Sequence, residues 1–340
     1  MIQIVEHAPR EGPYAIGAAI EAAGLPTRVC RTWAGDPVPD TADDLVGLVV
    51  MGGAMAAYED FPGRSAELAL LRAALAAEVP VLGVCLGAQL LAVAAGGVAR
   101  PGNGKQVGWA DVRMTEAARV DALFGAVPER LRVLYWHGDT MDLPAGATLL
   151  ASCDRYPVQA FRIGGSAWGT QFHLEADEST VGAFADAFPE EAATAPGVVD
   201  DAPAELAVLA PHRDGVFERF AAFVAQRAQQ TATRAFFTRR AAAWEERFAG
   251  DGPRYAEAVE RMELRPGRRV LDLGCGTGRA FPALRAQVGD AGLVVGVDLR
   301  ARCSPPRSAR AATTTAACSW PTPADCPCRR GRWTRSSAPA

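Results

Sequence analysis

Short apolar runs alternate with amphipathic stretches through the first half of the chain. The apolar runs have the length of β-strands, whereas the stretches between them repeat their apolar residues at helical spacing. The predicted strands are residues 2–5, 45–51, 79–84, 131–136, 148–151, 158–161 and 166–172, and the predicted helices are residues 14–23, 64–77, 86–95 and 179–188. Near-continuous apolar strands between helices predict a mostly parallel sheet with helices on both faces. The later strands have fewer helices between them, so we expect them to pair partly antiparallel.

A cysteine stands at the turn between one of these strands and the helix that follows. Cys85 lies in Gly-Val-Cys-Leu-Gly at residues 83–87. This layout is that of a nucleophile elbow, in which the glycines let the chain reverse and the first amides of the helix favour a thiolate. A buried structural cysteine in such a turn is also common. The interpretation therefore depends on what lies downstream.

A histidine and a glutamate follow the last predicted strand of this region. His173 and Glu175 are two residues apart, so they share one side of an extended segment. A thiol nucleophile needs a base, and the base needs a third group that fixes its tautomer. We therefore predict that Cys85, His173 and Glu175 form a catalytic triad. His137 is a rival base, which the sequence favours less.

Four motifs, taken in order, resemble those of the class I, triad-type glutamine amidotransferases. They are Met-Gly-Gly-Ala-Met at 51–55, Gly-Val-Cys-Leu-Gly-Ala-Gln at 83–89, Trp-His-Gly-Asp at 136–139 and Gln-Phe-His-Leu-Glu at 171–175. The resemblance covers residues 1–190 and is greatest to stand-alone members similar to the glutaminase domain of GMP synthase. Leu174 departs from the proline that is usual in the family. The resemblance implies a flavodoxin-like α/β fold.

The resemblance also implies a reaction and a site. The reaction is hydrolysis of a γ-carboxamide through a γ-glutamyl thioester, with release of ammonia and with no cofactor or metal. The implied catalytic residues are Cys85, His173 and Glu175, the implied oxyanion donors are the amides of Gly53 and Leu86, and the implied substrate-binding residues are Gly52, Gln89 and His137. The expected ligand is glutamine or a γ-glutamyl small molecule, and an ammonia-accepting synthetase is an expected partner.

Other functions stay open at this point. The same triad would serve a hydrolase of γ-glutamyl small molecules. A cysteine hydrolase of the protease-like and stress-protein-like kind has a similar architecture, but its histidine directly follows the nucleophile, whereas Leu86 follows Cys85 here. A third alternative is a vestigial or cofactor-binding fusion protein.

A second glycine-rich turn begins a separate unit. It reads Asp-Leu-Gly-Cys-Gly-Thr-Gly at residues 272–278, directly after an apolar strand, and a second strand at 293–297 ends at an aspartate. This incomplete Rossmann-like βαβ pattern is typical of nucleotide binding. It resembles motif I of the class I S-adenosylmethionine-dependent methyltransferases over residues 235–298. The resemblance implies that S-adenosylmethionine would contact Asp272, Gly274, Gly276, Gly278 and Asp298.

The composition changes abruptly after this second strand. Residues 299–340 are rich in Arg, Ser, Thr, Pro and Cys and show no apolar period, which predicts a disordered tail. Reading G/C-rich codons for residues 320–337 in a shifted frame gives Leu-Pro-Leu-Pro-Ala-Gly-Ser-Val-Asp-Ala-Val, which resembles the missing methyltransferase sequence. We hypothesise that a frameshift near residue 300 truncated that domain, so we do not expect methyltransferase activity.

Composition limits the remaining possibilities. The 340 residues predict an amidotransferase-like domain at 1–190, a helical extension at 191–230, a methyltransferase-like segment at 231–298 and the tail at 299–340. The net charge of −4 gives no case for nucleic acid, and no apolar run has the length of a membrane span. The eight cysteines do not form a secreted disulfide pattern and suggest no metal site, so we expect a cytoplasmic protein.

Overall fold

The computed structural model of the chain describes residues 1–247, 249–276, 278–298 and 316–318. The chain divides into two compact units, Met1–Gln230 and Thr231–Ala340. Each unit has its own β-sheet.

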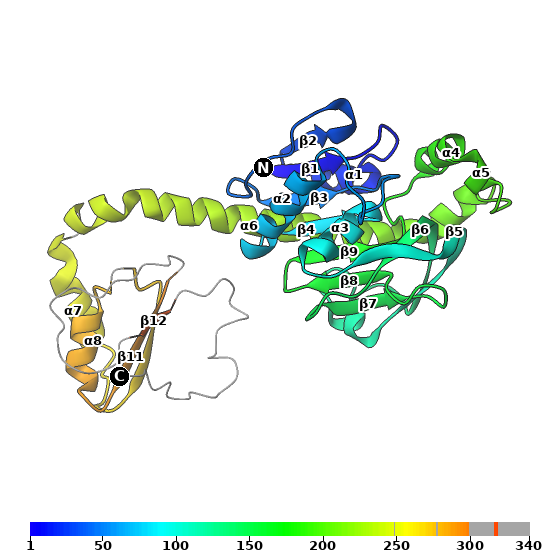
Figure 1. Cartoon of the computed structure of the whole chain (residues 1–340). Helices are drawn as coiled ribbons and strands as arrows, with labels where there is room; N and C mark the ends of the chain where they lie inside the picture. The colour runs from blue at the N-terminus through cyan, green and yellow to red at the C-terminus, as the bar shows by residue number, and fades with distance from the viewer. Residues whose placement is uncertain (248, 277, 299–315, 319–340) are drawn as a thin grey trace. The chain divides into compact units, whose positions relative to one another are not determined.

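The first unit is built on a nine-stranded sheet in the order β2-β1-β3-β4-β9-β8-β7-β5-β6 (Figure 1). The parallel half contains β2 (Thr27–Arg31), β1 (Ile2–Glu6), β3 (Gly47–Val50), β4 (Val81–Val84) and β9 (Ala167–Thr170). The antiparallel half contains β8 (Ala160–Ile163), β7 (Thr148–Ser152), β5 (Ala99–Met114) and β6 (Arg130–Met141). The parallel strands follow the flavodoxin-like order, so the predicted fold class is confirmed.

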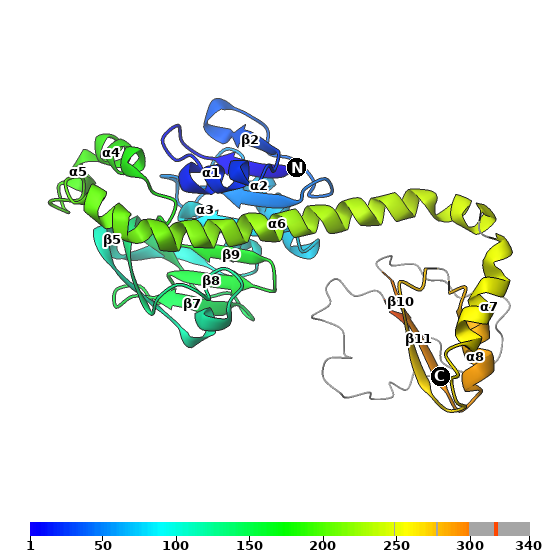
Figure 2. The same ribbon diagram turned by 180° about the vertical axis from the view of Figure 1, so that it is seen from behind.

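Helices cover both faces of this sheet, as its apolar strands require. Helices α2 (Arg64–Ala76) and α3 (Leu86–Ala94) share one buried core with alternate strand residues such as Val5. Helix α1 (Tyr14–Ala22) and the first part of α6 (Ala202–Arg247) share the other core with Ile2 and Ile4. Figure 2 shows α1 and α6 in front of the sheet. Shorter helices are η1 (Thr32–Ala34), η2 (Glu116–Val120), α4 (Glu178–Ala187) and α5 (Pro189–Ala192).

Two strands of the sheet were not expected from the sequence. Strand β2 carries mainly polar, exposed residues at the sheet edge, so it lacks the apolar run that marks the other strands. Strand β5 contains prolines and glycines near its start, and its pairing with β6 shifts register between Pro101 and Gln106. Glycine and proline normally interrupt a strand pattern. The β5–β6 pair nevertheless carries residues that line the candidate site.

Residues 189–211 are rich in Ala, Pro and acidic residues, a composition that predicts weak structure, but the second half of this segment is helical. Helix α6 begins at Ala202 and continues through Pro211 without a break. Its large buried residues form one apolar face against the sheet; they are Leu206, Leu209, Val216, Phe217, Phe220 and Val224. Because this apolar face is long, packing outweighs the backbone hydrogen bond that the proline removes.

The second unit contains η3 (Ala249–Asp251), α7 (Gly252–Glu260) and α8 (Phe281–Val288). Its parallel sheet has the order β10-β11-β12, formed by Arg269–Leu273, Leu293–Val297 and Ala316–Cys318. Strand β12 falls within the segment expected to be disordered, and the rest of that segment lies outside the described residues. In the part of the chain that the structure describes, no helix combines the length and the apolarity needed to span a bilayer.

Candidate active site

The candidate nucleophile lies at a sharp turn between β4 and α3. Cys85 has φ 50° and ψ −107°, a conformation that a residue with a side chain adopts only under strain. Its N–H donates to the Thr170 carbonyl at 2.8 Å, which ties the turn to β9. A Cβ on Gly83 would lie 2.6 Å from the Gly87 carbonyl oxygen, and a Cβ on Gly87 would collide with the Val50 carbonyl. The glycines of the motif therefore let helix and sheet approach closely.

The candidate base lies next to the thiol and is oriented by a carboxylate. His173 Nδ1 is 2.8 Å from Glu175 Oε1, and both side chains are buried. Cys85 lies beside the same imidazole, where it helps to raise the pKa of His173. The His173 N–H donates to the Leu134 carbonyl at 2.9 Å, which fixes the histidine against β6. The predicted triad residues thus lie together.

These contacts favour a charged histidine. Burial lowers the pKa of His173, but the Glu175 charge and the hydrogen bonds of the imidazole to Cys85 and Glu175 outweigh burial and raise this pKa well above its usual value of 6.5. The aromatic ring of Phe184 packs edge-on against the imidazole, with the centroids 5.0 Å apart. An imidazolium beside a thiol is the arrangement that stabilises a thiolate nucleophile.

A cavity of about 220 Å³ opens over the thiol. Of the residues predicted for the site, those that line it are Gly53, Cys85, Leu86, Gln89, His137 and His173. Gly52 lies beside the cavity, because a Cβ on Gly52 would collide with the Glu11 carboxylate and lie 3.4 Å from His173 Cε1. Glu175 stands behind the histidine rather than in the cavity wall.

The two predicted oxyanion donors reach the cavity from different elements. Leu86 is the first residue of α3, where backbone N–H groups have no partner within the helix. Gly53 follows the end of β3, and a Cβ there would lie 2.6 Å from Leu86 Cδ2 and 2.8 Å from His7 Cβ. Only glycine fits between these two side chains, so this backbone can approach the thiol closely.

Two glutamines connect the helix to the nucleophile. Gln89 Nε2 donates to Gln171 Oε1 at 3.1 Å, and Gln171 Nε2 donates toward Cys85 Sγ at 3.6 Å. Both glutamine side chains are buried. The family resemblance implies that Gln89 contacts substrate, and the structure adds this contact to Gln171. An amide donor at sulfur favours the thiolate over the thiol.

The rival base is held in a neutral form. Burial lowers the pKa of His137 to about 4, against a smaller opposite effect of its hydrogen bond to the Asp139 backbone. Nδ1 lies 2.9 Å from the Asp139 carbonyl oxygen, whereas the Asp139 carboxylate accepts from the Tyr58 hydroxyl at 3.2 Å. Among the described residues, His137 Nε2 has no hydrogen-bond partner. His137 therefore lacks the carboxylate that orients His173.

Glu11 is a wall residue that the sequence analysis did not identify. Its carboxylate is buried, lines the cavity and approaches Gly52. Burial raises its pKa, and the Glu175 charge acts in the same direction, while His173 and His7 lower it. Its position five residues after β1 could have indicated the site, because the carboxyl ends of parallel strands meet at one edge of the sheet.

The residues predicted to bind S-adenosylmethionine lie in the second unit. Gly274, Gly276 and Gly278 have φ values of 76°, 53° and 81°, which L-residues rarely adopt. The Gly276 N–H donates to Asp298 Oδ2 at 2.9 Å. Burial and the Asp298 charge raise the pKa of Asp272. The open glycine turn and the two acids fit a nucleoside ligand, although one Asp298 oxygen is already engaged. Among the described residues no cluster of three or more potential ligands is arranged to hold a metal ion.

Known proteins match the two units separately. The family model of the class I glutamine amidotransferases matches residues 14–185, and the model of protein-L-isoaspartate(D-aspartate) O-methyltransferase matches residues 252–311. The glutamine amidotransferase-like protein YfeJ of Salmonella typhimurium is 33% identical over 150 residues, which are 43% of this chain and 63% of YfeJ. The GMP synthase of Porphyromonas gingivalis is 32% identical over 155 residues, which are 45% of this chain and 29% of the synthase. The chain therefore spans less than two thirds of either relative.

Solved structures of glutamine amidotransferases are also similar to this chain. A glutamine amidotransferase from Thermotoga maritima has a TM-score of 0.59 at 30% identity, covering 65% of this chain and 97% of the other. A glutamine amidotransferase from Methylobacillus flagellatus has a TM-score of 0.61 at 29% identity, covering 65% and 94%. The family model alone spans just over half of the chain. The protein therefore belongs to the class I glutamine amidotransferase family and carries a methyltransferase-like segment in its second unit.

Proposed function

We propose that the first unit hydrolyses the γ-carboxamide of glutamine or of a γ-glutamyl amine, with Cys85 as nucleophile, His173 as base and Glu175 as the group that orients the base. The observation that carries the proposal is the strained cysteine turn beside a buried histidine–glutamate pair at the edge of one small cavity. Membership of the amidotransferase family supports the reaction type.

The reaction proceeds in two balanced steps. The Cys85 thiolate forms a bond to the amide carbon, and the C–N bond breaks as His173 gives its proton to the leaving nitrogen, so that ammonia or an amine departs. His173 then takes a proton from water, and the resulting hydroxide attacks the thioester. The C–S bond breaks, glutamate leaves and the thiolate is regenerated. Positioned proton transfer of this kind contributes typically 10²–10⁴-fold to the rate.

The cavity supports a small polar substrate. Its volume of about 220 Å³ is below the range that is usual for drug-sized ligands. The Glu11 carboxylate and the unpartnered His137 Nε2 are acceptors on its wall, as far as the described residues show. Acceptors of this kind suit the α-ammonium group of a γ-glutamyl compound.

The test is release of ammonia or amine from L-glutamine and a panel of γ-glutamyl amines. We expect Cys85→Ala to lower the rate by at least about 10³-fold, because loss of a nucleophile removes the covalent route. Cys30→Ala is the matched control, since Cys30 is also a buried free cysteine but does not line the cavity. Equal rates for the wild type and the Cys85 variant would exclude this mechanism.

The fate of the ammonia is a separate part of the proposal. The chain is similar to part of the GMP synthase of Porphyromonas gingivalis, an enzyme that is named for hydrolysing glutamine. We propose that a separate synthetase accepts the ammonia. Addition of such a partner should raise glutamine hydrolysis, whereas fast cleavage of one γ-glutamyl amine by the protein alone would identify a small-molecule hydrolase instead.

The second unit supports a second candidate function, binding of S-adenosylmethionine. The observation in its favour is the glycine turn after β10 with Asp272 and Asp298 beside it, in a segment that matches a methyltransferase family. When bound, this group supplies a methyl on a sulfonium sulfur. Calorimetric titration of the full chain with S-adenosylmethionine tests the binding, and we expect Asp298→Ala to abolish the heat signal. A signal that Asp298→Ala leaves unchanged would rule out this site.

A further inference from the structure

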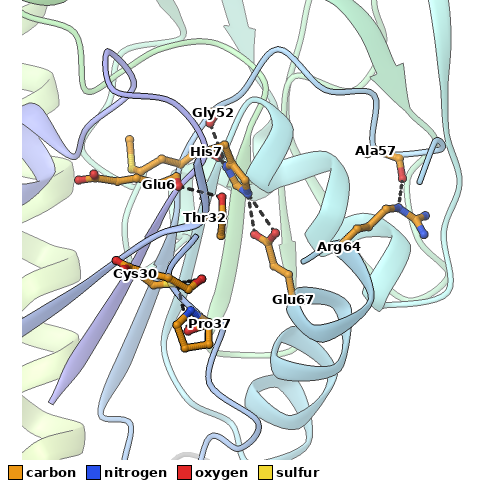
Figure 3. A network of polar contacts seen from close by, with 11 residues as sticks. Glu6, His7, Cys30, Thr32, Pro37, Gly52, Ala57, Arg64 and Glu67 are labelled. Carbon is orange, nitrogen blue, oxygen red and sulfur yellow. Dashed lines mark hydrogen bonds and ion pairs between the residues drawn. The ribbon is translucent and has the colours of Figure 1, made fainter. Parts of the chain in front are cut away.

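A buried ion pair lies directly behind the predicted oxyanion turn. His7 follows β1, and Glu67 belongs to the first turn of α2; both side chains have 0% exposure. His7 Nε2 is 3.0 Å from each carboxylate oxygen of Glu67. On the other side of the ring, Nδ1 is 3.1 Å from the Met51 carbonyl oxygen and 3.0 Å from that of Gly52. Figure 3 shows His7 between Gly52 and Glu67.

The two carbonyl contacts require a proton on Nδ1, and the contact to the Glu67 carboxylate favours a second proton on Nε2. Carbonyl oxygens only accept, so Nδ1 must be the donor toward Met51 and Gly52. Glu67 accepts from Nε2 in the same way. Burial lowers the pKa of His7, but the hydrogen bond and charge of Glu67, the Gly52 carbonyl and the Glu11 charge together raise it above its usual value of 6.5. These interactions favour an imidazolium that donates in two directions.

The contact to the Gly52 carbonyl fixes the direction of the next N–H group. No peptide bond in the described chain is cis, and in a trans peptide the C=O and the following N–H point in opposite directions. The Gly52 carbonyl points to His7, so the Gly53 N–H points away from His7. Gly53 lines the cavity together with Cys85 and Leu86. Within the described chain, the Gly53 N–H has no backbone hydrogen-bond partner.

We propose that His7 and Glu67 act as positioning residues for the oxyanion hole, by holding the Gly52–Gly53 peptide with its N–H toward the oxygen of the reacting carbonyl group. The proposal rests on the proposed function of the first unit. A peptide between two glycines has few steric limits on its rotation, so an external contact is needed to keep one orientation. Oxyanion stabilisation depends on donors that are already in place when charge develops.

A purely structural role explains the pair less well. Two buried charges cost desolvation free energy, and apolar side chains of similar volume often stabilise a protein as much or more. What an apolar pair cannot supply is a donor to two backbone carbonyls. The charge of Glu67 keeps His7 protonated, and only the protonated ring donates to the carbonyls and to Glu67 at once.

The test uses two amide replacements of the histidine in one background. Asn places an amide nitrogen where His has Nδ1, and Gln places one where His has Nε2. Both are made with Glu67→Gln, so that no unpaired charge stays buried. His7→Asn/Glu67→Gln therefore keeps a donor for the Gly52 carbonyl, and His7→Gln/Glu67→Gln loses it. The Glu67→Gln single variant is the common reference, and circular dichroism with urea unfolding establishes that each variant folds.

Two reactions of the same thiol are compared. Hydrolysis of a γ-glutamyl amide passes through an oxyanion, whereas alkylation of Cys85 by iodoacetamide is a displacement at carbon that forms none. Alkylation at Cys85 is followed by peptide mass spectrometry, because the chain has other free cysteines. We expect His7→Gln/Glu67→Gln to lower kcat by about 10²-fold, with KM and the alkylation rate within about threefold of the reference. We expect His7→Asn/Glu67→Gln to keep kcat within about tenfold.

Each remaining outcome decides the question. Equal loss of hydrolysis and alkylation would overturn the proposal, because His7 would then support the whole site and not the oxyanion donor. Unchanged hydrolysis in His7→Gln/Glu67→Gln would also overturn the positioning role. In that case the proposed function would still stand if hydrolysis by the wild type depends on Cys85. If wild type and Cys85→Ala hydrolyse every amide equally, the proposed function fails, and the positioning role fails with it.

Discussion

The contact between His173 and Glu175 gives the most direct test of the triad. Glu175→Gln removes the negative charge and leaves a side chain of almost the same shape. The carboxylate lies 2.8 Å from Nδ1, so its charge stabilises the imidazolium that forms when the thiolate is generated. The glutamine can still accept one neutral hydrogen bond from Nδ1. The substitution therefore isolates the contribution of charge.

The expected magnitude follows from Coulomb's law. Two unit charges about 4 Å apart interact by about 4 kcal/mol at an effective dielectric constant of ~20. The neutral hydrogen bond that glutamine retains recovers about 1 kcal/mol. The net loss of about 3 kcal/mol corresponds to roughly 10²-fold in kcat, since each 1.4 kcal/mol is a factor of ten.

The assay combines amide hydrolysis with the pH dependence of Cys85 alkylation. Glu175 raises the pKa of His173, so its removal lowers this pKa and narrows the pH range in which imidazolium and thiolate coexist. We expect the alkylation rate of Glu175→Gln to fall more at pH 6 than at pH 9. Glu178→Gln is the matched control, because the same substitution three residues later affects an exposed side chain.

Two results would contradict this reasoning. Hydrolysis within about threefold of the wild type would show that the carboxylate charge is not needed. An alkylation profile that keeps its shape while hydrolysis falls would show that Glu175 acts without changing the protonation of His173. The first result would remove Glu175 from the triad, and the second would refute the electrostatic role and leave Glu175 only the role of orienting the imidazole.

Three further predictions concern the walls of the site. Gly53→Ala should lower the rate of amide hydrolysis at least tenfold, because the added Cβ would lie 2.6 Å from Leu86 Cδ2. Gly165→Ala is the control and should have no effect, since a Cβ there meets open space. Equal activities of the two variants would contradict this account of the packing. The pKa of His137 is lowered to about 4, so the folded protein binds this proton less readily than the unfolded chain does, and stability present above pH 6.5 should be lost as pH falls toward 4. The free energy of unfolding, measured with urea, should fall by about 3 kcal/mol over this pH range, and this fall should be absent in His137→Gln. If His137→Gln shows the same dependence of stability on pH as the wild type, another group causes it. Phe184→Ala should reduce the free energy of unfolding by about 3–5 kcal/mol, because the buried ring packs against Trp136 and the candidate base. A reduction below about 1 kcal/mol would show that neighbouring side chains fill the cavity left by the ring.

The parts of the site that lie within one local motif could be predicted from the sequence. Cys85 stands in a strand–turn–helix pattern, and His173 and Glu175 are two residues apart, so each signal is contained in a few positions. The structure places these residues in contact around one cavity. Their catalytic role stays a prediction until the variants are measured.

The missed residues depend on the order of strands rather than on a local pattern. His7 meets Gly52 only because β1 and β3 are parallel neighbours whose ends coincide. Glu67 reaches the same place from α2, 60 residues further along the chain. No periodicity in a single sequence indicates such a contact. A histidine directly after a buried strand was the one available signal.

Helix α6 limits how the enzyme unit can be separated from its neighbour. A chain shortened after residue 190, the boundary suggested by the motifs, would keep every triad residue but would lose the helix face formed by Val216, Phe217, Phe220 and Val224. Apolar side chains of the sheet would then face water, and such a fragment should aggregate. Helix α6 lines no part of the cavity, yet it determines the smallest fragment that contains the candidate site and stays folded. That fragment ends near Gln230.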